Sequence, residues 1–361
     1  MKQLDLAGKR VLLIKPSSLG DVCHAAASAW AIKQQFPTCH LTWLVNKTFE
    51  PLIKPLSCLD GTLGFERTKF RGVTGMLTGR SELRSFVSQL RAGRFDVAID
   101  LQGLLRSGMF SWLSRAKVRV GMRGSREGSR LFYNRRVEVP RQPVHARDRY
   151  RAVTRFLGCE TEPREDLDVR ETERAAARDL LAANGFAADS PLVAVCPGAR
   201  WETKIYPPQK FAAALDELAK SGVVTPVIIG SPDMDKPCAE VAAACKKARP
   251  VNLCGKTSLR ELAALLDISR LLLTCDSGPM HIAAAQGTPV VAVLGPTDAR
   301  RTGPYGQLQN VVTGDCELMP CLKRECPGLG IKCMRELDAE DVAERALQVL
   351  QSKTSGRRAK I

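Results

Sequence analysis

The chain has 361 residues and a mass of 39.4 kDa, a length that fits two domains of ordinary size. Hydrophobic residues make up 44% and charged residues 25%, which excludes a disordered or collagen-like protein. Lys and Arg exceed Asp and Glu by 16. The sequence has no apolar run of 18 residues, and the apolar stretch at 11–14 is too short for the core of a signal peptide. We therefore expect a cytoplasmic protein.

The positive charge is concentrated in residues 101–160, which carry 14 basic and 4 acidic side chains. Such a segment raises the local concentration of anions. Nucleic acid, an anionic membrane surface and a phosphorylated small substrate are candidate partners, and a solvated basic face is the alternative. Aromatic residues make up only 5%, which argues against a stacking platform for single strands.

Short apolar stretches alternate with helical patterns along the chain. In the first half, strands are predicted at 10–15, 41–45 and 97–101, and a helix at 21–35. In the second half, strands are predicted at 192–196, 224–229, 251–253, 271–275 and 290–294, and helices at 209–220, 237–247, 259–268 and 280–286. This alternation indicates parallel βαβ units, so the sequence predicts two doubly wound α/β domains.

The domain boundary is expected between residues 160 and 190. A polar stretch there ends in a predicted helix at 171–184, with Gly185 at its carboxyl end. The assigned domains are residues 1–170, residues 185–336, and a C-terminal helix with a basic tail at 337–361. The helix is placed at 338–350, and the tail at 353–361 is expected to fray.

Ligands of doubly wound sheets bind beyond the carboxyl ends of the strands, so functional residues are expected in the loops there. The loop KPSSLGDVCH at 15–24 places Asp21 in the first turn of a helix. An Asp there stabilises the helix by interacting favourably with its dipole, and an ionised carboxylate can also accept a proton. The loop at 196–208 presents Arg200 and Lys204 before a helix, which suits phosphate binding or an ordinary surface loop.

The loop at 274–298 places Asp276, Ser277 and Gly278 between a strand and a helix that starts near Pro279. Free backbone N–H groups at such a helix start can hold a diphosphate, and His281 lies in the first turn. The chain lacks GxGxxG after its first strand and lacks GxxxxGK[ST] throughout, so both common nucleotide fingerprints are missing.

The chain has thirteen cysteines, which we expect to be reduced. Nine are isolated among apolar residues and are predicted to be small core side chains. Cys316, Cys321, Cys326 and Cys333 form a cluster with four, four and six residues between them. This spacing contains no CxxC pair and fits neither zinc ribbons nor iron–sulfur sites, so reduced thiols or a redox-dependent disulfide are favoured over a metal.

At these loops the sequence resembles glycosyltransferase family 9, the lipopolysaccharide heptosyltransferases. The resemblance covers nearly the whole chain. It rests on KPSSLGDVCH at 15–24, DLQGLLRSG at 100–108, PGARWETKIYP at 197–207, LCGKTSLRELAALL at 253–266 and the long motif DSGPMHIAAAQGTPVVAVLGPTDARRTGPYG at 276–306. It implies a GT-B fold of two Rossmann-like domains that face a central cleft.

The resemblance also implies an activity: inverting transfer of heptose from ADP-L-glycero-D-manno-heptose to the Kdo or first heptose of the lipopolysaccharide inner core. Asp21 would be the general base, with His24 as its rival, and Lys204 would contact the diphosphate. The donor site would comprise Thr203, Lys204, Lys256, Thr257, Ser258, Asp276, Ser277, Gly278 and His281. The acceptor, which is strongly anionic, is assigned to Ser18, Gly20, Arg106, Arg123 and Arg126. We expect no metal, no cofactor and no nucleic acid, and a peripheral contact with the cytoplasmic membrane face.

The sequence departs from the family pattern at two places. Ile205 and Tyr206 stand where members often have Arg and Trp in TKRWP, and the ribose-binding carboxylate is ambiguous between Asp233 and Asp235. Three other readings stay open: a nicotinamide-dependent oxidoreductase, a basic nucleic-acid-binding protein without transferase activity, and a relative that kept the fold but lost transfer. The missing glycine fingerprint argues against the first, and the presence of Asp21 and Lys204 against the last.

Overall fold

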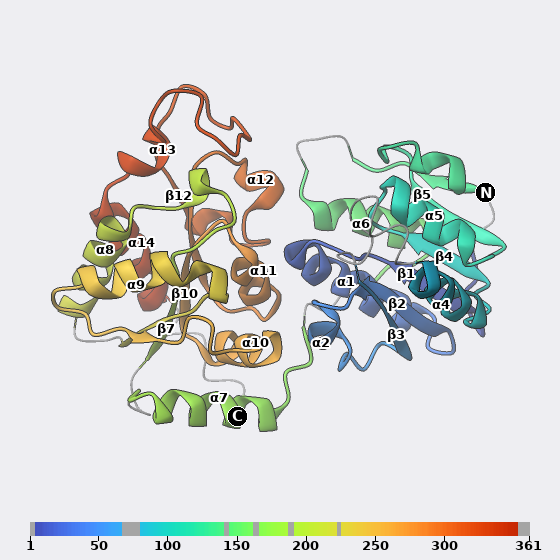
Figure 1. Cartoon of the computed structure of the whole chain (residues 1–361), viewed down its shortest axis with the longest axis horizontal. Coiled ribbons are helices and arrows are strands. Elements are labelled where there is room, and N and C mark those ends of the chain that lie inside the picture. Colours follow the sequence, from blue (N-terminus) through green and yellow to red (C-terminus); the bar gives the residue numbers. More distant parts are fainter. Residues whose placement is uncertain are drawn as a thin grey trace. The chain divides into compact units, whose positions relative to one another are not determined.

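The structure is a computed structural model that describes residues 4–66, 80–140, 144–161, 166–186, 191–221 and 225–352. The chain divides into two compact units, Met1–Asp168 and Val169–Ile361, each with its own sheet (Figure 1). The division falls within the stretch 160–190, whereas the finer limits 1–170, 185–336 and 337–361 remain predictions. No described helix is long and apolar enough to cross a membrane.

The first unit is built on a parallel sheet of six strands in the order β3-β2-β1-β4-β5-β6. The strands are β1 (Arg10–Ile14), β2 (His40–Asn46), β3 (Gly61–Phe65), β4 (Val97–Asp100), β5 (Val118–Met122) and β6 (Arg135–Val137). The helices are α1 (Leu19–Gln35), α2 (Glu50–Ile53), α4 (Arg80–Ala92), α5 (Leu105–Leu113), the 3-10 helix η2 (Ser129–Phe132) and α6 (Ala146–Phe156).

Two central strands of this sheet set the position of the site. β1 pairs with β2 in the register Arg10↔His40 and with β4 in the register Val11↔Val97. The chain order reverses between β1 and β4, which is the switch point where doubly wound sheets bind ligands. Helix α1 packs against α6, while α4 packs against α5.

The second unit repeats this architecture with the strand order β12-β11-β10-β7-β8-β9. The strands are β7 (Leu192–Cys196), β8 (Thr225–Ile228), β9 (Val251–Asn252), β10 (Leu271–Cys275), β11 (Val290–Leu294) and β12 (Val311–Thr313). The helices are α7 (Glu171–Ala183), η3 (Glu202–Lys204), α8 (Pro208–Lys220), η4 (Pro232–Met234), α9 (Asp235–Ala244), α10 (Leu259–Ile268), α11 (Gly278–Ala285), α12 (Ala299–Thr302), η5 (Leu308–Asn310), α13 (Lys332–Arg335) and α14 (Ala339–Ser352).

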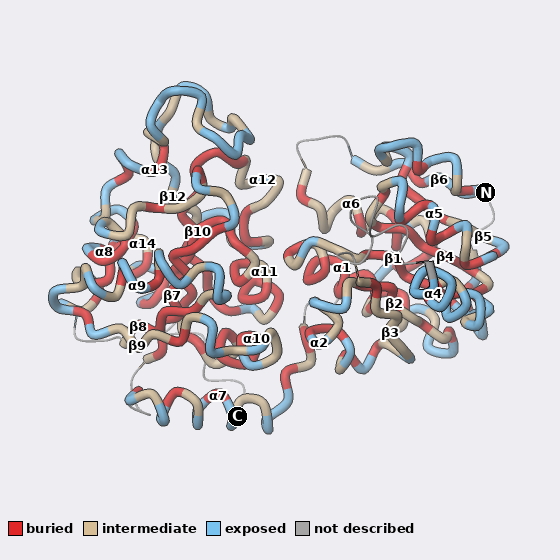
Figure 2. Tube along the Cα trace, viewed as in Figure 1, coloured by how far each residue is buried: buried red, intermediate tan, exposed pale blue. Residues whose placement is uncertain are grey.

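Each unit has its own core, and Figure 2 shows the buried residues concentrated along the strands. In the first unit, Phe65, Phe86 and Phe110 pack with ring centroids 4.9–5.2 Å apart. In the second unit, every residue of β7, β10 and β11 is buried. Such continuous apolar strands are expected when helices cover both faces of a parallel sheet.

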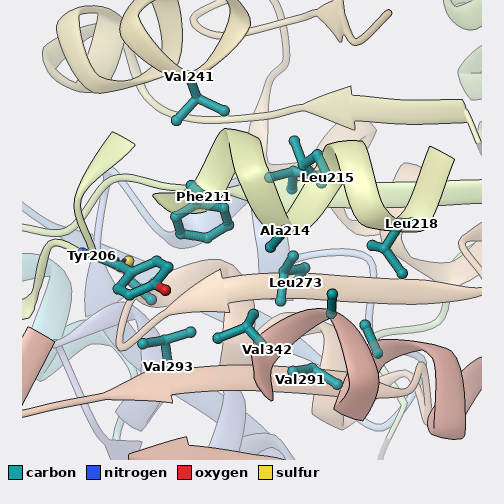
Figure 3. Close-up of a cluster of buried hydrophobic side chains, with 14 of the residues drawn as sticks. Tyr206, Phe211, Ala214, Leu215, Leu218, Val241, Leu273, Val291, Val293 and Val342 are labelled. Atoms are coloured by element: carbon teal, nitrogen blue, oxygen red, sulfur yellow. Dashed lines mark hydrogen bonds between the residues drawn. The ribbon is translucent and has the colours of Figure 1, made fainter. Parts of the chain in front are cut away.

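Helix α14 belongs to the core of the second unit. Figure 3 shows Val342 of this helix beside Val293 of β11, with Tyr206 and Phe211 nearby. Tyr206 is fully buried, and its hydroxyl donates to the carbonyl of Leu337 at 3.0 Å. Tyr206, which departs from the family pattern, is therefore a core residue whose hydroxyl has a hydrogen-bond partner.

Most predicted elements are found with ends shifted by one to three residues. The helix at 259–268 matches α10, and Gly185 follows α7 with a φ of 82°, as a helix end with glycine requires. Val224, the start of one predicted strand, and the tail at 353–361 lie outside the described residues. Fourteen described elements were not predicted: the strands β3, β5, β6 and β12, the helices α2, α4, α5, α6, α12 and α13, and the four 3-10 helices.

Candidate functional site

Asp21 is held at the start of α1, directly beyond the carboxyl end of β1. Its Oδ2 accepts the backbone N–H of Ser18 at 3.1 Å and the Ser18 hydroxyl at 3.0 Å. Its Oδ1 accepts the Tyr150 hydroxyl at 2.8 Å and lies 3.4 Å from Nζ of Lys15. The side chain remains 31% exposed, so a substrate hydroxyl can reach the carboxylate.

These partners control the ionisation of Asp21. Burial acts to raise the pKa of the carboxyl, but Lys15, Tyr150 and Ser18 outweigh it and lower the pKa to about 2. Burial also lowers the pKa of the Lys15 ammonium, against the carboxylates of Asp21 and Asp100. Asp21 is therefore ionised at neutral pH.

A pocket of about 180 Å³ opens beside this loop in the first unit. It is lined by residues at the carboxyl ends of β1 to β4, at the start of α5 and in the loop after β5: Pro16, Ser17, Asn46, Phe65, Gln102, Leu104, Arg106, Ser107 and Glu127. The Arg106 guanidinium lies 5.8 Å from the centre of the Phe65 ring, and the Gln102 amide oxygen accepts the Ser17 N–H at 3.4 Å. The pocket therefore combines an aromatic face, amide groups and a cation, one residue away from the Ser18 that holds Asp21.

The other residues assigned to the acceptor have different surroundings. Gly20 is buried within α1. Arg123 is exposed and forms an ion pair with Glu138, the residue directly after β6. Arg126 is exposed on the turn after β5. The structure thus brings Arg106 into the pocket and leaves Arg123 and Arg126 on the surface.

In the second unit, Lys204 and Asp276 form a buried ion pair. Nζ of Lys204 lies 2.8 Å from Oδ2 of Asp276, and the two side chains are 14% and 5% exposed. The same oxygen accepts the Thr297 hydroxyl at 2.6 Å and the Thr302 hydroxyl at 3.4 Å. Nζ also lies 4.5 Å from the centre of the Trp201 ring. A lysine ammonium held in an ion pair of this kind can exchange its carboxylate partner for a phosphate oxygen.

Ser277 and Gly278 lie at the start of α11, which begins at Gly278, one residue before the predicted start near Pro279. Ser277 is the residue before the first turn, and Pro279 lies within that turn. The Ser277 hydroxyl lies 3.2 Å from the Thr274 hydroxyl and 3.5 Å from Sγ of Cys196. His281 is half-buried on the same helix. The first N–H groups of α11 therefore follow directly after the carboxylate that holds Lys204.

The remaining donor-site candidates have structural roles in the described part of the chain. The Thr203 hydroxyl donates to the carbonyl of Lys323 at 2.9 Å, and Lys256 donates to Oδ1 of Asn184 at 3.3 Å. Ser258 accepts the N–H of Glu261 at 3.3 Å and so caps α10. Thr257 is half-buried, and Asp233 and Asp235 are both exposed.

Cys316, Cys321, Cys326 and Cys333 line one small cavity. Sγ of Cys326 accepts the N–H of Ile331 at 3.2 Å. Within the described residues, no group of three or more His, Cys, Asp or Glu side chains is arranged to hold a metal ion. Of the nine other cysteines, Cys245 and Cys254 are half-buried and seven are buried.

Sequence reasoning missed several residues of these two sites. In the sequence, Lys15 has only the pattern of a strand end. Tyr150 lies 129 residues from its partner Asp21, in a segment whose one notable feature is its arginines. Thr297 and Thr302 lie 21 and 26 residues beyond Asp276. The one available signal was the Lys directly after an apolar strand, since a cation there lies at the edge where ligands bind.

Comparison with known proteins points to one family. A family model described as Glycosyltransferase family 9 (heptosyltransferase) matches residues 83–332. The lipopolysaccharide core heptosyltransferase OpsX of Haemophilus influenzae is 30% identical over 314 residues, with 85% of each chain covered.

Two solved structures are also similar. A family 9 glycosyltransferase from Veillonella parvula has a TM-score of 0.82 at 23% identity and covers 97% of this chain and 99% of its own. The E. coli heptosyltransferase WaaC with ADP has a TM-score of 0.73 at 25% identity and covers 94% and 99%. With a doubly wound sheet in each unit, these matches confirm the GT-B fold that the resemblance implied.

Proposed function

Because the chain belongs to glycosyltransferase family 9, the heptosyltransferases, we propose that it transfers heptose from ADP-L-glycero-D-manno-heptose to the inner core of lipopolysaccharide, with inversion at the anomeric carbon. The chain is a glycosyltransferase. The names of its relatives support a lipopolysaccharide acceptor and an ADP-containing donor. Neither an oxidoreductase nor a nucleic-acid-binding protein is among the relatives described above.

The partly exposed, ionised Asp21 beside the pocket carries the proposal for the acceptor half of the reaction. A hydroxyl of the acceptor sugar attacks the anomeric carbon, and its proton passes to the Asp21 carboxylate. A carboxyl with a pKa of about 2 is a weak base. It suffices if the proton leaves late, because the attacking oxygen becomes strongly acidic as its bond to carbon forms.

Lys204 carries the proposal for the donor half. As the bond between the anomeric carbon and the diphosphate breaks, the electron pair stays with ADP and negative charge develops on its phosphate oxygens. Lys204 is held ready by Asp276 and Trp201, and the first N–H groups of α11 are available beside it. Fixed donors of this kind stabilise developing charge without reorganising.

The acceptor is proposed to be anionic and borne by a lipid. Arg106 in the pocket and the basic segment around it would attract phosphate and sugar-acid groups. Such an acceptor also suggests work at the cytoplasmic membrane face, through a peripheral contact.

A transfer assay tests the function. The protein is incubated with ADP-heptose and either Kdo-bearing lipid A or the same acceptor that already carries one heptose, and ADP release and product mass are measured. Addition of one heptose to either acceptor supports the proposal and identifies the acceptor. Failure with both acceptors, by protein that binds ADP, would contradict it.

A further inference from the structure

Resting on the proposed function, we infer that Tyr150 and Lys15 are positioning residues for the base: together they fix Oδ1 of Asp21 in the plane and charge state in which it receives the proton. The two side chains come from different elements, the end of β1 and helix α6. They meet at one oxygen of a carboxylate that is still partly exposed.

Tyr150 acts as a fixed hydrogen-bond donor. Its side chain is buried on α6, and its hydroxyl is 2.8 Å from Oδ1. Burial and the nearby Asp21 carboxylate raise the pKa of the Tyr150 phenol well above its ordinary value. The phenol therefore stays protonated at neutral pH and always donates to Asp21.

Lys15 provides the second contact with Oδ1 of Asp21. Its side chain is only 3% exposed, and Nζ lies 3.4 Å from Oδ1 and 5.2 Å from the centre of the Tyr150 ring. A buried cation is costly unless it is paired, so its partner must remain charged. The contact with the Lys15 ammonium thus both holds the Asp21 carboxylate in place and keeps it ionised.

Helix capping alone does not account for this arrangement. Ser18 already binds Oδ2 through its N–H and its hydroxyl, which is what an Asp in a first helical turn needs. A buried lysine and a tyrosine from a second helix add nothing to the cap itself. Their common target is the other oxygen.

A second tyrosine–aspartate pair in the same unit provides the contrast. The Tyr133 hydroxyl donates to Oδ2 of Asp100 at 2.6 Å, and Asp100 is fully buried. Two N–H groups of the loop after β4 bind the other Asp100 oxygen. This pair is closed to solvent and holds a loop, whereas Asp21 is open to an incoming hydroxyl.

The charged and titratable groups around Asp21 come from four elements. They are Lys15 after β1, Cys23 on α1, Asp100 at the end of β4, and Arg149 and Tyr150 on α6. His24 of α1 and His145, the N-cap of α6, pack against each other. Lys15 is the cation whose charge acts most directly on the pKa of Asp21.

The test uses variants of the full chain: Tyr150→Phe, Lys15→Met and Lys15→Arg, with Tyr133→Phe as the control and Asp21→Asn as the reference for loss of the base. Tyr150→Phe removes one oxygen and frees a lone pair of Oδ1. We expect kcat to fall about 10- to 100-fold, because a loosely held catalytic group loses rate steeply, while KM for the acceptor and the affinity for ADP change little.

Lys15→Met is expected to add a pH dependence. Without the ammonium, burial raises the pKa of Asp21 unopposed by its main counter-charge, so the fraction ionised falls in mildly acidic buffer. The ratio of variant kcat to wild-type kcat should therefore decrease as the pH is lowered from about 8 to about 5. Lys15→Arg, which keeps the charge, should restore much of that ratio.

Tyr133→Phe removes the same type of hydrogen bond from the buried pair. It should lower the melting temperature and leave kcat and its pH profile as in the wild type. If Tyr150→Phe behaves like Tyr133→Phe, the inference is wrong. The proposed function fails separately, if the wild-type protein transfers heptose to neither acceptor. Full activity of Asp21→Asn would show that Asp21 is not the base and would overturn the inference with it. An inactive Asp21→Asn with unaffected Tyr150→Phe and Lys15→Met overturns only the positioning role.

Discussion

A single carboxylate at position 21 both closes the first turn of a helix and stands as the proposed base, and asparagine separates the two roles. Asn keeps the shape and can still accept from Ser18, but it cannot take up a proton. We predict that Asp21→Asn folds, binds ADP normally and loses kcat by about 10²- to 10⁴-fold, the usual effect of removing a general base.

His24 provides the matched comparison for this prediction. Its ring packs edge-on against His145, with centroids 4.5 Å apart, and its side chain is 8% exposed. We expect His24→Ala to lower stability and to change kcat little. Full activity in Asp21→Asn together with a collapse of kcat in His24→Ala would assign the base to His24 instead.

The low pKa of Asp21 also predicts how stability depends on pH. The pKa is about 2 in the folded chain and near its ordinary value of 3.8 in the unfolded chain, so unfolding takes up a proton in acid. The stabilisation, about 1–2 kcal/mol after allowance for partial exposure, is present above pH 4 and is lost as the pH falls towards 2.

Urea unfolding of the wild type and of Asp21→Asn at several pH values measures this effect. The difference in unfolding free energy should be constant from pH 8 to about pH 5 and should narrow below pH 4. A difference that stays constant down to pH 3 would show that the carboxyl has no depressed pKa.

At the scale of elements, the four clustered cysteines lie in a long connection that contains little regular structure. Cys316, Cys321 and Cys326 are half-buried between β12 and α13, and Cys333 is buried on α13. We predict that the reduced protein holds no metal there and that the cluster is structural. Elemental analysis of purified protein checks this, and stoichiometric zinc or iron would contradict it.

The strands that are easiest to predict from sequence are those with apolar residues on both faces. β7, β10 and β11 are buried at every residue, and their apolar runs are unmistakable in the sequence. β3 contains two glycines, and β6 has two exposed arginines in three residues, so neither shows a strand pattern. Edge strands bury less, and their sequences are correspondingly less constrained.

The site shows the same limit. Asp21 and Ser277 were predictable because a helix start and a strand end are local patterns. The partner of Asp21 was not, since α6 (ARDRYRAVTRF) reads as a basic segment and its one tyrosine meets Asp21 only after the chain has folded. Long-range partners of this kind have no local signature in one sequence.

At the scale of the whole molecule, the two ligands are predicted to depend on different units. Charge reversal of Arg123 and Arg126 together should raise KM for the acceptor and leave the affinity for ADP nearly unchanged. Lys204→Met should do the opposite and weaken ADP binding, about 10- to 100-fold for the loss of a charged contact. Steady-state kinetics and ADP titration of both variants measure the two effects.

A control for net charge lies in the same basic segment. Arg115 and Lys117 are exposed at the amino end of β5, away from the carboxyl ends that form the pocket. Their double reversal changes the net charge equally and should leave KM for the acceptor close to the wild-type value. Equal weakening of ADP binding in the Arg123 and Arg126 variant would show that these arginines serve the donor.

The buried thiols make each unit report on its own unfolding. Burial raises the pKa of Cys23 and Cys58 to about 12, and it also raises the pKa of Cys196 and Cys275. Alkylating reagents consume the thiolate, so these positions react only when the surrounding structure opens. Timed alkylation read by peptide mass, with Cys23 and Cys58 for the first unit and Cys196 and Cys275 for the second, therefore reveals whether the two halves of the chain open together or one before the other.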